Sequence, residues 1–346
     1  MAICYVDIID SCHLKCPTCV RGTRLLPNTA AKSTLDRFTE TVVKAKTEGY
    51  DAVGLYNWTE PFLNPKLPEY VGIIKALGLS CETSTTLSFT KRETLIEEAL
   101  RAGIDTLIVS VSGFTQEIHG INHRGGNLQY VKQNLEHISA LKKAGKIRTR
   151  VTLRLIRFDY NADQEAPLAD YANSLGLNFE VIQGVGDPQH PVSEYADENH
   201  FLDRLRHYSP ERSYEKPGEV CPLVMDTVSI NAAGKVFICC AYPNYPFLEI
   251  GDYLNMTKEE IMFKRYTHPI CNSCSFPRRK ASEDDLAALN LALRGFLGQS
   301  TMIRPATERP RPVAVPVEIP AKPPGVARNG RTLRDRFRVW VKTRSA

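Results

Sequence analysis

Three cysteines near the start of the chain constrain its structure more than any other feature. They lie in the stretch Cys12-His-Leu-Lys-Cys16-Pro-Thr-Cys19, which follows a buried strand predicted at residues 3–9. A cubane iron-sulfur cluster has four irons, so three thiolates on one short loop leave one iron open to an outside ligand. A tetrahedral zinc site is the alternative, with His13 as the local fourth ligand. The preceding strand favours the cluster, because it places the cysteines where α/β barrels carry their sites.

Strands and helices alternate with short connections up to about residue 205, which predicts an α/β fold with a parallel sheet. Strands are predicted at 3–9, 52–56, 79–85, 106–112, 150–158 and 178–183, and helices at 33–48, after Pro65, and at 91–102, 127–144 and 163–175. Six strand-helix units fall short of the eight that close a TIM barrel. We therefore expect a partial (β/α)6 TIM-like barrel over residues 1–205.

The composition is that of an ordinary globular protein, with 42% hydrophobic and 24% charged residues in a chain of 346. It contains no apolar run long enough to span a bilayer and no secretory signal, so we expect a cytoplasmic protein. Eight of the ten cysteines fall into clusters, which in a reducing compartment indicates metal binding rather than disulfides. The remaining two, Cys4 and Cys81, are predicted to be buried apolar positions.

Positive charge is concentrated in the last 46 residues. They hold eleven Lys and Arg against three Asp and Glu, so the tail carries +8 and the first 300 residues carry −3. The globular part is therefore not expected to bind nucleic acid. Residues 305–324 contain seven prolines and are predicted to be extended, and a basic amphipathic helix is predicted around Leu333 to Val341. Docking on the barrel or disorder is favoured for that helix over peripheral contact with a membrane.

Polar side chains follow several of the predicted strands. The second strand ends in Asn57-Trp-Thr-Glu60-Pro61, the third in Ser84-Thr-Thr86-Leu-Ser88 and the fourth in Ser110-Val-Ser112-Gly113, while Arg124 and Asn161 lie in later loops. A carboxylate such as Glu60 suits a bound cation, and the planar fork of Arg124 suits a carboxylate. His119 belongs to the same region and would titrate near neutrality if its surroundings left its pKa unchanged.

The cysteine loop and these strand ends together resemble the radical S-adenosylmethionine (SAM) enzymes. The turn at Glu60 is similar to the family's Gly-Glu-Pro motif, with Thr59 where Gly is usual. The resemblance implies that Cys12, Cys16 and Cys19 bind a [4Fe-4S] cluster whose open iron binds SAM. It also implies that an electron from a flavodoxin- or ferredoxin-type reductant cleaves SAM to a 5'-deoxyadenosyl radical. It assigns SAM contacts to Glu60, Thr86, Ser110, Ser112, Arg124 and Asn161.

A second group of cysteines lies further along the chain. Residues 221–239 predict a β-hairpin that turns at 231–234 and carries Cys221 and Cys239 at its far ends; a helix at 258–264 and the pair Cys271-Asn-Ser-Cys274 follow. This pattern resembles the twitch module, the shortened form of the SPASM domain, in which four such cysteines hold an auxiliary [4Fe-4S] cluster. A four-cysteine zinc site is the alternative, and Cys240 is an alternative ligand to Cys239. The predicted domains are 1–205, 206–285 and a helix, linker and tail at 286–346.

The resemblance implies hydrogen abstraction from a substrate carbon after SAM cleavage. An auxiliary cluster with four protein ligands has no open iron, which favours electron transfer and an oxidation like that of 2-deoxy-scyllo-inosamine dehydrogenase-like twitch enzymes. The first strand begins at residue 3, so no preceding peptide-recognition domain is expected, and a small polar substrate such as a sugar or cyclitol is preferred. The alternatives are a peptide maturase or epimerase and, from another class, a non-catalytic iron-sulfur electron-transfer or scaffold protein.

Overall fold

The computed structural model describes residues 1–29, 31–184, 188, 218–272, 274 and 276–297. The predictions for the Pro-rich segment and the basic tail lie outside these residues. Within the described part, no helix is both long and apolar enough to cross a membrane.

Six parallel strands form the first part of the sheet and confirm the predicted partial barrel. They are β1 (Ile3–Val6), β2 (Ala52–Gly54), β3 (Ser80–Thr85), β4 (Thr106–Val111), β5 (Arg150–Arg157) and β6 (Asn178–Gln183), paired in that order. The connecting helices are α1 (Leu35–Thr47), α2 (Leu67–Ala76), α3 (Glu93–Ala102), α4 (Gln116–Asn122), α5 (Leu128–Lys143) and α6 (Glu165–Ser174). Short 3-10 helices lie at η1 (Pro61–Leu63) and η2 (Asp159–Gln164).

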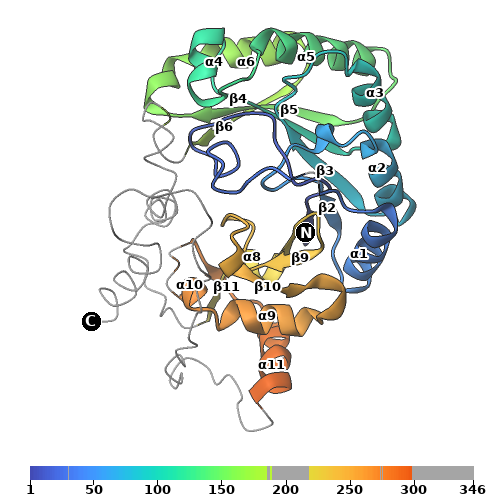
Figure 1. The fold of residues 1–346 in the computed structure, drawn as a ribbon, viewed down its shortest axis with the longest axis vertical. Coiled ribbons are helices and arrows are strands. Elements are labelled where there is room, and N and C mark those ends of the chain that lie inside the picture. Colours follow the sequence, from blue (N-terminus) through green and yellow to red (C-terminus); the bar gives the residue numbers. More distant parts are fainter. Residues whose placement is uncertain (30, 185–187, 189–217, 273, 275, 298–346) are drawn as a thin grey trace.

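The helices cover the outer side of a curved sheet, as Figure 1 shows. Alternation along each strand explains this arrangement, since successive side chains point to opposite faces. Cys4 and Val6 of β1 pack with Phe38 and Val42 of α1 in the main hydrophobic core, so Tyr5 points to the inner face. Cys81 is also fully buried, and the prediction that Cys4 and Cys81 are buried positions is confirmed.

Helix ends are defined by local side-chain chemistry. Thr34 caps α1 by accepting a hydrogen bond from Arg37 N, and Asn127 caps α5 in the same way through Gln129 N and Tyr130 N. Helix α3 ends at Gly103, whose φ of 114° lies in the left-handed region that favours glycine.

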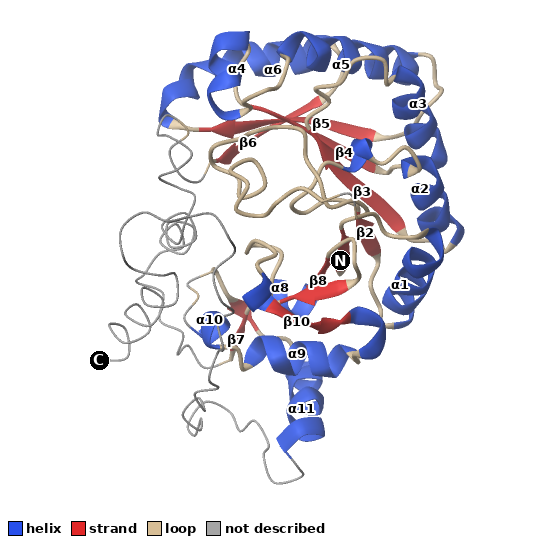
Figure 2. Ribbon diagram, viewed as in Figure 1, coloured by secondary structure: helices blue, strands red, loops and turns tan. Residues whose placement is uncertain are grey.

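The second part of the chain continues the same sheet. Strand β8 (Thr227–Ile230) pairs in parallel with the free side of β1, and β9 (Lys235–Phe237) and β10 (Glu249–Asp252) extend it in antiparallel fashion. The full order is β10-β9-β8-β1-β2-β3-β4-β5-β6. The sheet therefore crosses from the predicted barrel into the predicted second module without a break (Figure 2).

The predicted hairpin is present but shorter than expected. Its turn lies at Asn231–Gly234, where Gly234 N donates to Asn231 O at 2.9 Å and Gly234 has a φ of 79°. Residues 222–226 are not strand but the short helix α8 (Pro222–Asp226). Pro222 explains the difference, because proline fits the first turn of a helix and cannot donate to a strand ladder.

Further elements pack around this hairpin. They are β7 (Glu219–Val220), which pairs with β11 (Arg279–Lys280), the 3-10 helices η4 (Pro246–Leu248) and η5 (Tyr253–Asn255), and the helices α9 (Lys258–Tyr266), α10 (Pro269–Asn272) and α11 (Glu283–Leu297). Helix α1 joins the two parts through an Arg37–Asp252 ion pair at 2.6 Å and a hydrogen bond from Tyr253 Oη to Glu48 at 2.6 Å.

Candidate metal centres

The loop that carries Cys12, Cys16 and Cys19 follows β1 and lies on the inner side of the sheet (Figure 1). The side chain of Asn28 holds its first turn by accepting from Cys12 N at 3.1 Å and donating to Cys12 O at 2.6 Å. Thr18 Oγ1 donates to Asn122 Oδ1 of α4 at 2.8 Å. These contacts fix the loop against the carboxyl end of the barrel.

Gly22 makes a close approach to the cysteine loop that no other residue type permits. A Cβ atom at this position would lie 2.3 Å from Cys16 O and 2.4 Å from Cys16 N. Backbone atoms cannot yield as a flexible side chain can, so any larger residue would displace Cys16. Nothing in the sequence around Gly22 signalled this role.

The three thiols of this loop lie near one another in a poorly solvated place. Burial raises the pKa of Cys12 to about 12, with further contributions from the Glu60 carboxylate and from Cys19. Burial, Cys19 and Cys12 likewise hold the pKa of Cys16 well above its usual value. A thiolate in such a place needs a positive charge nearby, which the iron of a cluster would supply, so the donor set is compatible with an iron-sulfur cluster.

Glu60 lies at the turn after β2 and is almost completely buried. One carboxylate oxygen accepts from Phe62 N at 3.2 Å and Thr85 Oγ1 at 2.8 Å, and the other accepts from Thr86 N at 2.9 Å and Thr86 Oγ1 at 3.2 Å. Burial nevertheless raises the pKa of Glu60. The structure thus brings the predicted residues Glu60 and Thr86 together and ties the ends of β2 and β3.

The other predicted SAM contacts lie at the ends of β4 and β5. Ser112 is fully buried and hydrogen-bonds to His123 Nδ1 at 2.5 Å, while Ser110 on the same strand is half-buried. Asn161 is fully buried and donates to Ser112 O at 2.8 Å and Ile156 O at 3.0 Å. Its amide therefore joins the two strand ends, and a contact between Asn161 and the cofactor stays a prediction.

Arg124 is linked directly to the cysteine loop. Its carbonyl oxygen accepts from Lys15 N at 2.8 Å, and its guanidinium donates to Pro188 O at 3.1 Å. His119 stacks on His123 with ring centroids 4.6 Å apart. Burial lowers the pKa of His119 to about 4, so this residue does not titrate near neutrality, contrary to the unperturbed value considered from sequence.

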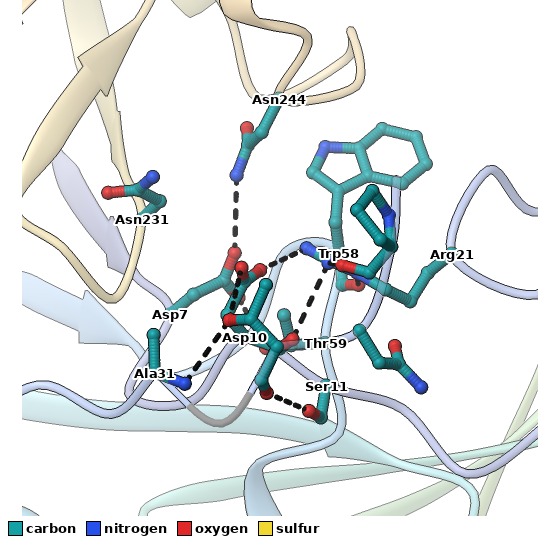
Figure 3. Close-up of polar contacts among 12 residues, drawn as sticks. Asp7, Asp10, Ser11, Arg21, Ala31, Trp58, Thr59, Asn231 and Asn244 are labelled. Carbon is teal, nitrogen blue, oxygen red and sulfur yellow. Dashed lines mark hydrogen bonds and ion pairs between the residues drawn. The ribbon is translucent and has the colours of Figure 1, made fainter. Parts of the chain in front are cut away.

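Asp7 is a buried carboxylate at the end of β1 that the sequence predictions missed. Figure 3 shows it between the turn after β2 and the second part of the chain. It accepts from Thr59 Oγ1 at 2.7 Å, Asn57 N at 3.0 Å and Asn244 Nδ2 at 3.4 Å. Thr59, which stands where the resemblance led us to expect Gly, therefore uses its hydroxyl to hold Asp7.

The cysteines of the second group also lie close to one another. Burial and the neighbouring thiols raise the pKa of Cys271 and Cys274, and Cys239 and Cys221 are among those neighbours for both. Cys240 instead lies near Thr227, at 3.8 Å from its hydroxyl, and contributes to the raised pKa of Tyr5. Cys239 and Cys240 also hydrogen-bond to each other and pack in the same cluster as Cys271 and Cys274, so the choice between Cys239 and Cys240 as ligand stays a prediction. Within the described residues, no three Cys, His, Asp or Glu side chains converge on a single metal ion.

Arg265 is a buried cation beside the second group of cysteines. Its side chain on α9 is 1% exposed, and its guanidinium donates to Ile238 O and Leu223 O at 2.6 Å each, to Val224 O at 3.4 Å and to Thr227 O. Among the described residues no carboxylate pairs with it. Its charge lowers the pKa of Cys221, Cys239 and Cys271 against the effect of burial.

A buried cation without a carboxylate partner is costly unless an anion lies nearby. Four thiolates around a metal centre supply such an anion, so the site fits an anionic metal-thiolate group. The sequence contains a signal for this buried cation, because Arg265 lies on the apolar face of helix α9 with the buried Ile261 and Met262.

These features define an α/β protein whose cofactor site is built on a cysteine loop after the first strand. Residues 6–172 match the model of the Radical SAM superfamily, so this part of the chain is a radical SAM domain. The cofactors of that family are SAM and a [4Fe-4S] cluster, and the three cysteines of the first loop lie within the matched residues. The comparison with curated protein sequences gave no match.

Solved structures with a similar fold include SuiB of Streptococcus suis bound to the precursor peptide SuiA, at 13% identity and a TM-score of 0.56. That match covers 78% of this chain and 65% of SuiB. The structure of SuiB without the peptide matches at 12% identity and a TM-score of 0.56, and the match covers 79% of this chain and 70% of SuiB. BtrN in complex with AdoMet and 2-DOIA matches with 10% identity and a TM-score of 0.44, and the match covers 80% of this chain and 92% of BtrN. At these identities the likeness to SuiB shows the fold alone, and the BtrN match carries no argument.

We expect Gly22→Ala to lose most of the iron bound by the first cysteine loop. The added methyl group overpacks the turn against the Cys16 backbone, at a cost of about 1–3 kcal/mol. Iron content and the cluster absorbance after anaerobic reconstitution measure the effect. Gly72→Ala in helix α2 is the matched control, because a Cβ there meets nothing within 4 Å. Equal iron in both variants would contradict the role of Gly22.

Asp7 should make the protein less stable as pH rises from about 4 to 6. Burial raises its pKa from 3.8 to about 6, although the Thr59 hydrogen bond and the Arg21 charge act to lower it, so the folded state binds a proton that the unfolded state has released in this window. A shift of this size corresponds to about 3 kcal/mol. Asp7→Asn should flatten that part of the stability profile in denaturant titrations. Asp36→Asn, at an exposed position of α1, should leave the slope unchanged.

Arg265→Met should lower both the iron content of the second cysteine group and the free energy of unfolding. The change removes the cation beside the thiols and leaves buried carbonyls without a donor, at about 1–3 kcal/mol each. Iron is measured in a protein that also lacks Cys12, Cys16 and Cys19, so that only this group contributes. Lys264→Met, one residue away and exposed, should retain its iron. Full iron in both variants would show that Arg265 has no electrostatic role.

Proposed function

We propose that the chain catalyses the oxidation of a small polar substrate, sugar- or cyclitol-like, with a second cluster as electron acceptor. Cys12, Cys16 and Cys19 would hold the SAM-binding cluster. The auxiliary cluster would be held by Cys221, Cys239, Cys271 and Cys274. When bound, SAM and the first cluster supply the 5'-deoxyadenosyl radical that takes a hydrogen atom from the substrate.

The observation that supports this proposal is the buried guanidinium of Arg265, whose charge lowers the pKa of Cys221, Cys239 and Cys271. Four protein thiolates satisfy four irons, so no position is open to substrate and the group suits electron transfer. The buried guanidinium stabilises added negative charge, because it is held on four carbonyls and has no carboxylate of its own within the described chain. An electron acceptor fits an oxidation better than a reaction without net electron change.

The residues at the strand ends would orient SAM. The carboxylate of Glu60 already accepts four hydrogen bonds, which use its ordinary acceptor capacity, so we propose that it mainly holds the turn whose backbone faces the SAM ammonium group. Arg124 can turn its guanidinium from Pro188 O to the SAM carboxylate, and its main chain already contacts the cysteine loop. A flavodoxin- or ferredoxin-type protein is the proposed reductant.

Anaerobic reconstitution tests this function. The wild type should bind about eight irons, as two clusters of four, and form 5'-deoxyadenosine when reduced in the presence of SAM. A triple Cys12, Cys16 and Cys19→Ala variant should keep about four irons and form no 5'-deoxyadenosine. Cys81→Ala, a buried cysteine outside both groups, should behave as the wild type. Two clusters without SAM cleavage in the wild type would favour the scaffold alternative and overturn the proposal.

A further inference from the structure

The turn after β2 contacts both of the parts of the chain that carry clustered cysteines. Residues 57–59, which we call the bridging turn, lie between β2 and the buried Glu60. Figure 3 shows Trp58 and Thr59 of this turn beside Asp7 and Arg21, with Asn244 of the second part of the chain on the other side of Asp7. The hydrogen bonds of the bridging turn fall into two sets, one for each part.

The first set reaches both ends of the first cysteine loop. The carbonyl oxygen of Trp58 accepts from Arg21 Nε at 3.4 Å, two residues beyond the last cysteine of that loop. Arg21 is 3% exposed and forms an ion pair with Asp10, so its side chain closes the base of the loop. Directly after the turn, Glu60 N donates to Ser11 O at 2.9 Å, next to the first cysteine. The bridging turn and the first cysteine loop therefore hold each other in place.

The second set reaches the segment that carries Cys239 and Cys240. The indole Nε1 of Trp58 donates to Tyr242 O at 3.0 Å. With its amide oriented to satisfy both ends, Asn57 donates to Cys240 O at 3.0 Å. Asn244 donates at 3.4 Å to the buried carboxylate at the end of β1, which the bridging turn also holds. Three residues of this segment thus bond to the turn or to its carboxylate partner.

This segment depends on its cysteines for its position. Residues 238–245 form turns and irregular structure between β9 and η4. Tyr242 is 2% exposed and packs with Cys239 in a cluster that also includes Cys271 and Cys274. A metal-thiolate bond at Cys239 or Cys240 would fix the segment within three residues of the carbonyl that binds Trp58. An empty second cysteine group leaves the segment without this attachment.

We propose that Trp58 is a positioning residue that makes SAM binding depend on the metal occupancy of the second cysteine group. This inference rests on the proposed function, because it requires a second cluster. When the second group is filled, the carbonyl of Tyr242 holds the indole, and the turn next to Glu60 is ordered before SAM arrives. When that group is empty, the turn becomes ordered only as SAM binds, and the loss of conformational entropy lowers the affinity.

Such a dependence suits a reaction that needs an electron acceptor. A protein whose second group is empty has no acceptor for the electron that an oxidation releases. It then binds SAM weakly and seldom forms a radical that cannot complete the reaction. One hydrogen bond and the ordering of a short turn support a change in affinity of about five- to tenfold.

A double-mutant cycle tests the proposal. The affinity for radiolabelled SAM is measured by anaerobic equilibrium dialysis without reductant in four reconstituted proteins. They are the wild type, Trp58→Phe, a Cys271→Ala and Cys274→Ala pair, and the combination of these changes. Phenylalanine keeps an aromatic ring but lacks the N–H group. We expect the cysteine pair to weaken SAM binding about five- to tenfold in the wild-type background and less than about twofold in the Trp58→Phe background.

Tyr253→Phe is the matched control. It removes one hydrogen bond between the same two parts of the chain, from Tyr253 Oη to Glu48 at the end of helix α1. Its affinity for SAM should equal that of the wild type, whereas Trp58→Phe alone should bind SAM about five- to tenfold more weakly with its iron content unchanged. This comparison keeps the proposal testable if the cysteine pair does not fold.

Equal losses from the cysteine pair in both backgrounds would overturn the proposal, because Trp58 would then have only a structural role. Unchanged SAM affinity in Trp58→Phe, or an equal loss in Tyr253→Phe, would also overturn it. If these results came from a wild type that binds about eight irons and forms 5'-deoxyadenosine, the proposed function would stand. A wild type with only about four irons would overturn the proposed function and this inference with it.

Discussion

The pairing of β1 on both of its sides is the interaction on which the rest of the structure depends. Strand β1 bonds in parallel to β2 on one side and to β8 on the other, so it joins the barrel and the second module in one sheet. The same short strand leads into the first cysteine loop, carries Tyr5 on its inner face and ends beside Asp7. A change in its register by one residue would turn Tyr5 toward the helices and Cys4 toward the site.

Most of the fold was predictable because its signals are local. The six strands of the barrel lie where alternating and β-branched patterns placed them, and the turn at Asn231–Gly234 lies where its sequence predicts. The parallel pairing of β8 with β1 was not predictable, because it joins residues more than 220 positions apart and leaves no periodic pattern. The helix α8 was missed for a smaller reason, since the hairpin prediction overlooked what Pro222 does to a strand.

The site was predictable where chemistry depends on residue type and spacing. Both groups of cysteines, Glu60 and Thr86 were predicted in this way; the structure brings Glu60 and Thr86 together, and the metal ligands stay predictions. Asp7, Gly22 and Arg265 were missed because their roles depend on distant backbone. Gly22 leaves room for the backbone of Cys16. Asp7 accepts hydrogen bonds from the backbone amide of Asn57 and the hydroxyl of Thr59, which belong to another loop. Arg265 donates to four carbonyl oxygens of the hairpin region.

The position of β1 in the middle of the sheet also shapes how the chain folds during synthesis. β1 is made first, but its partner β8 is made only after some 220 further residues, so one edge of the strand stays without its native partner while the barrel assembles. Contacts this distant in sequence slow folding and leave hydrogen-bonding edges exposed to other chains. The first cysteine loop follows directly after β1. The carboxyl end of β1, from which this loop starts, therefore gains its second hydrogen-bonded neighbour only at that late stage.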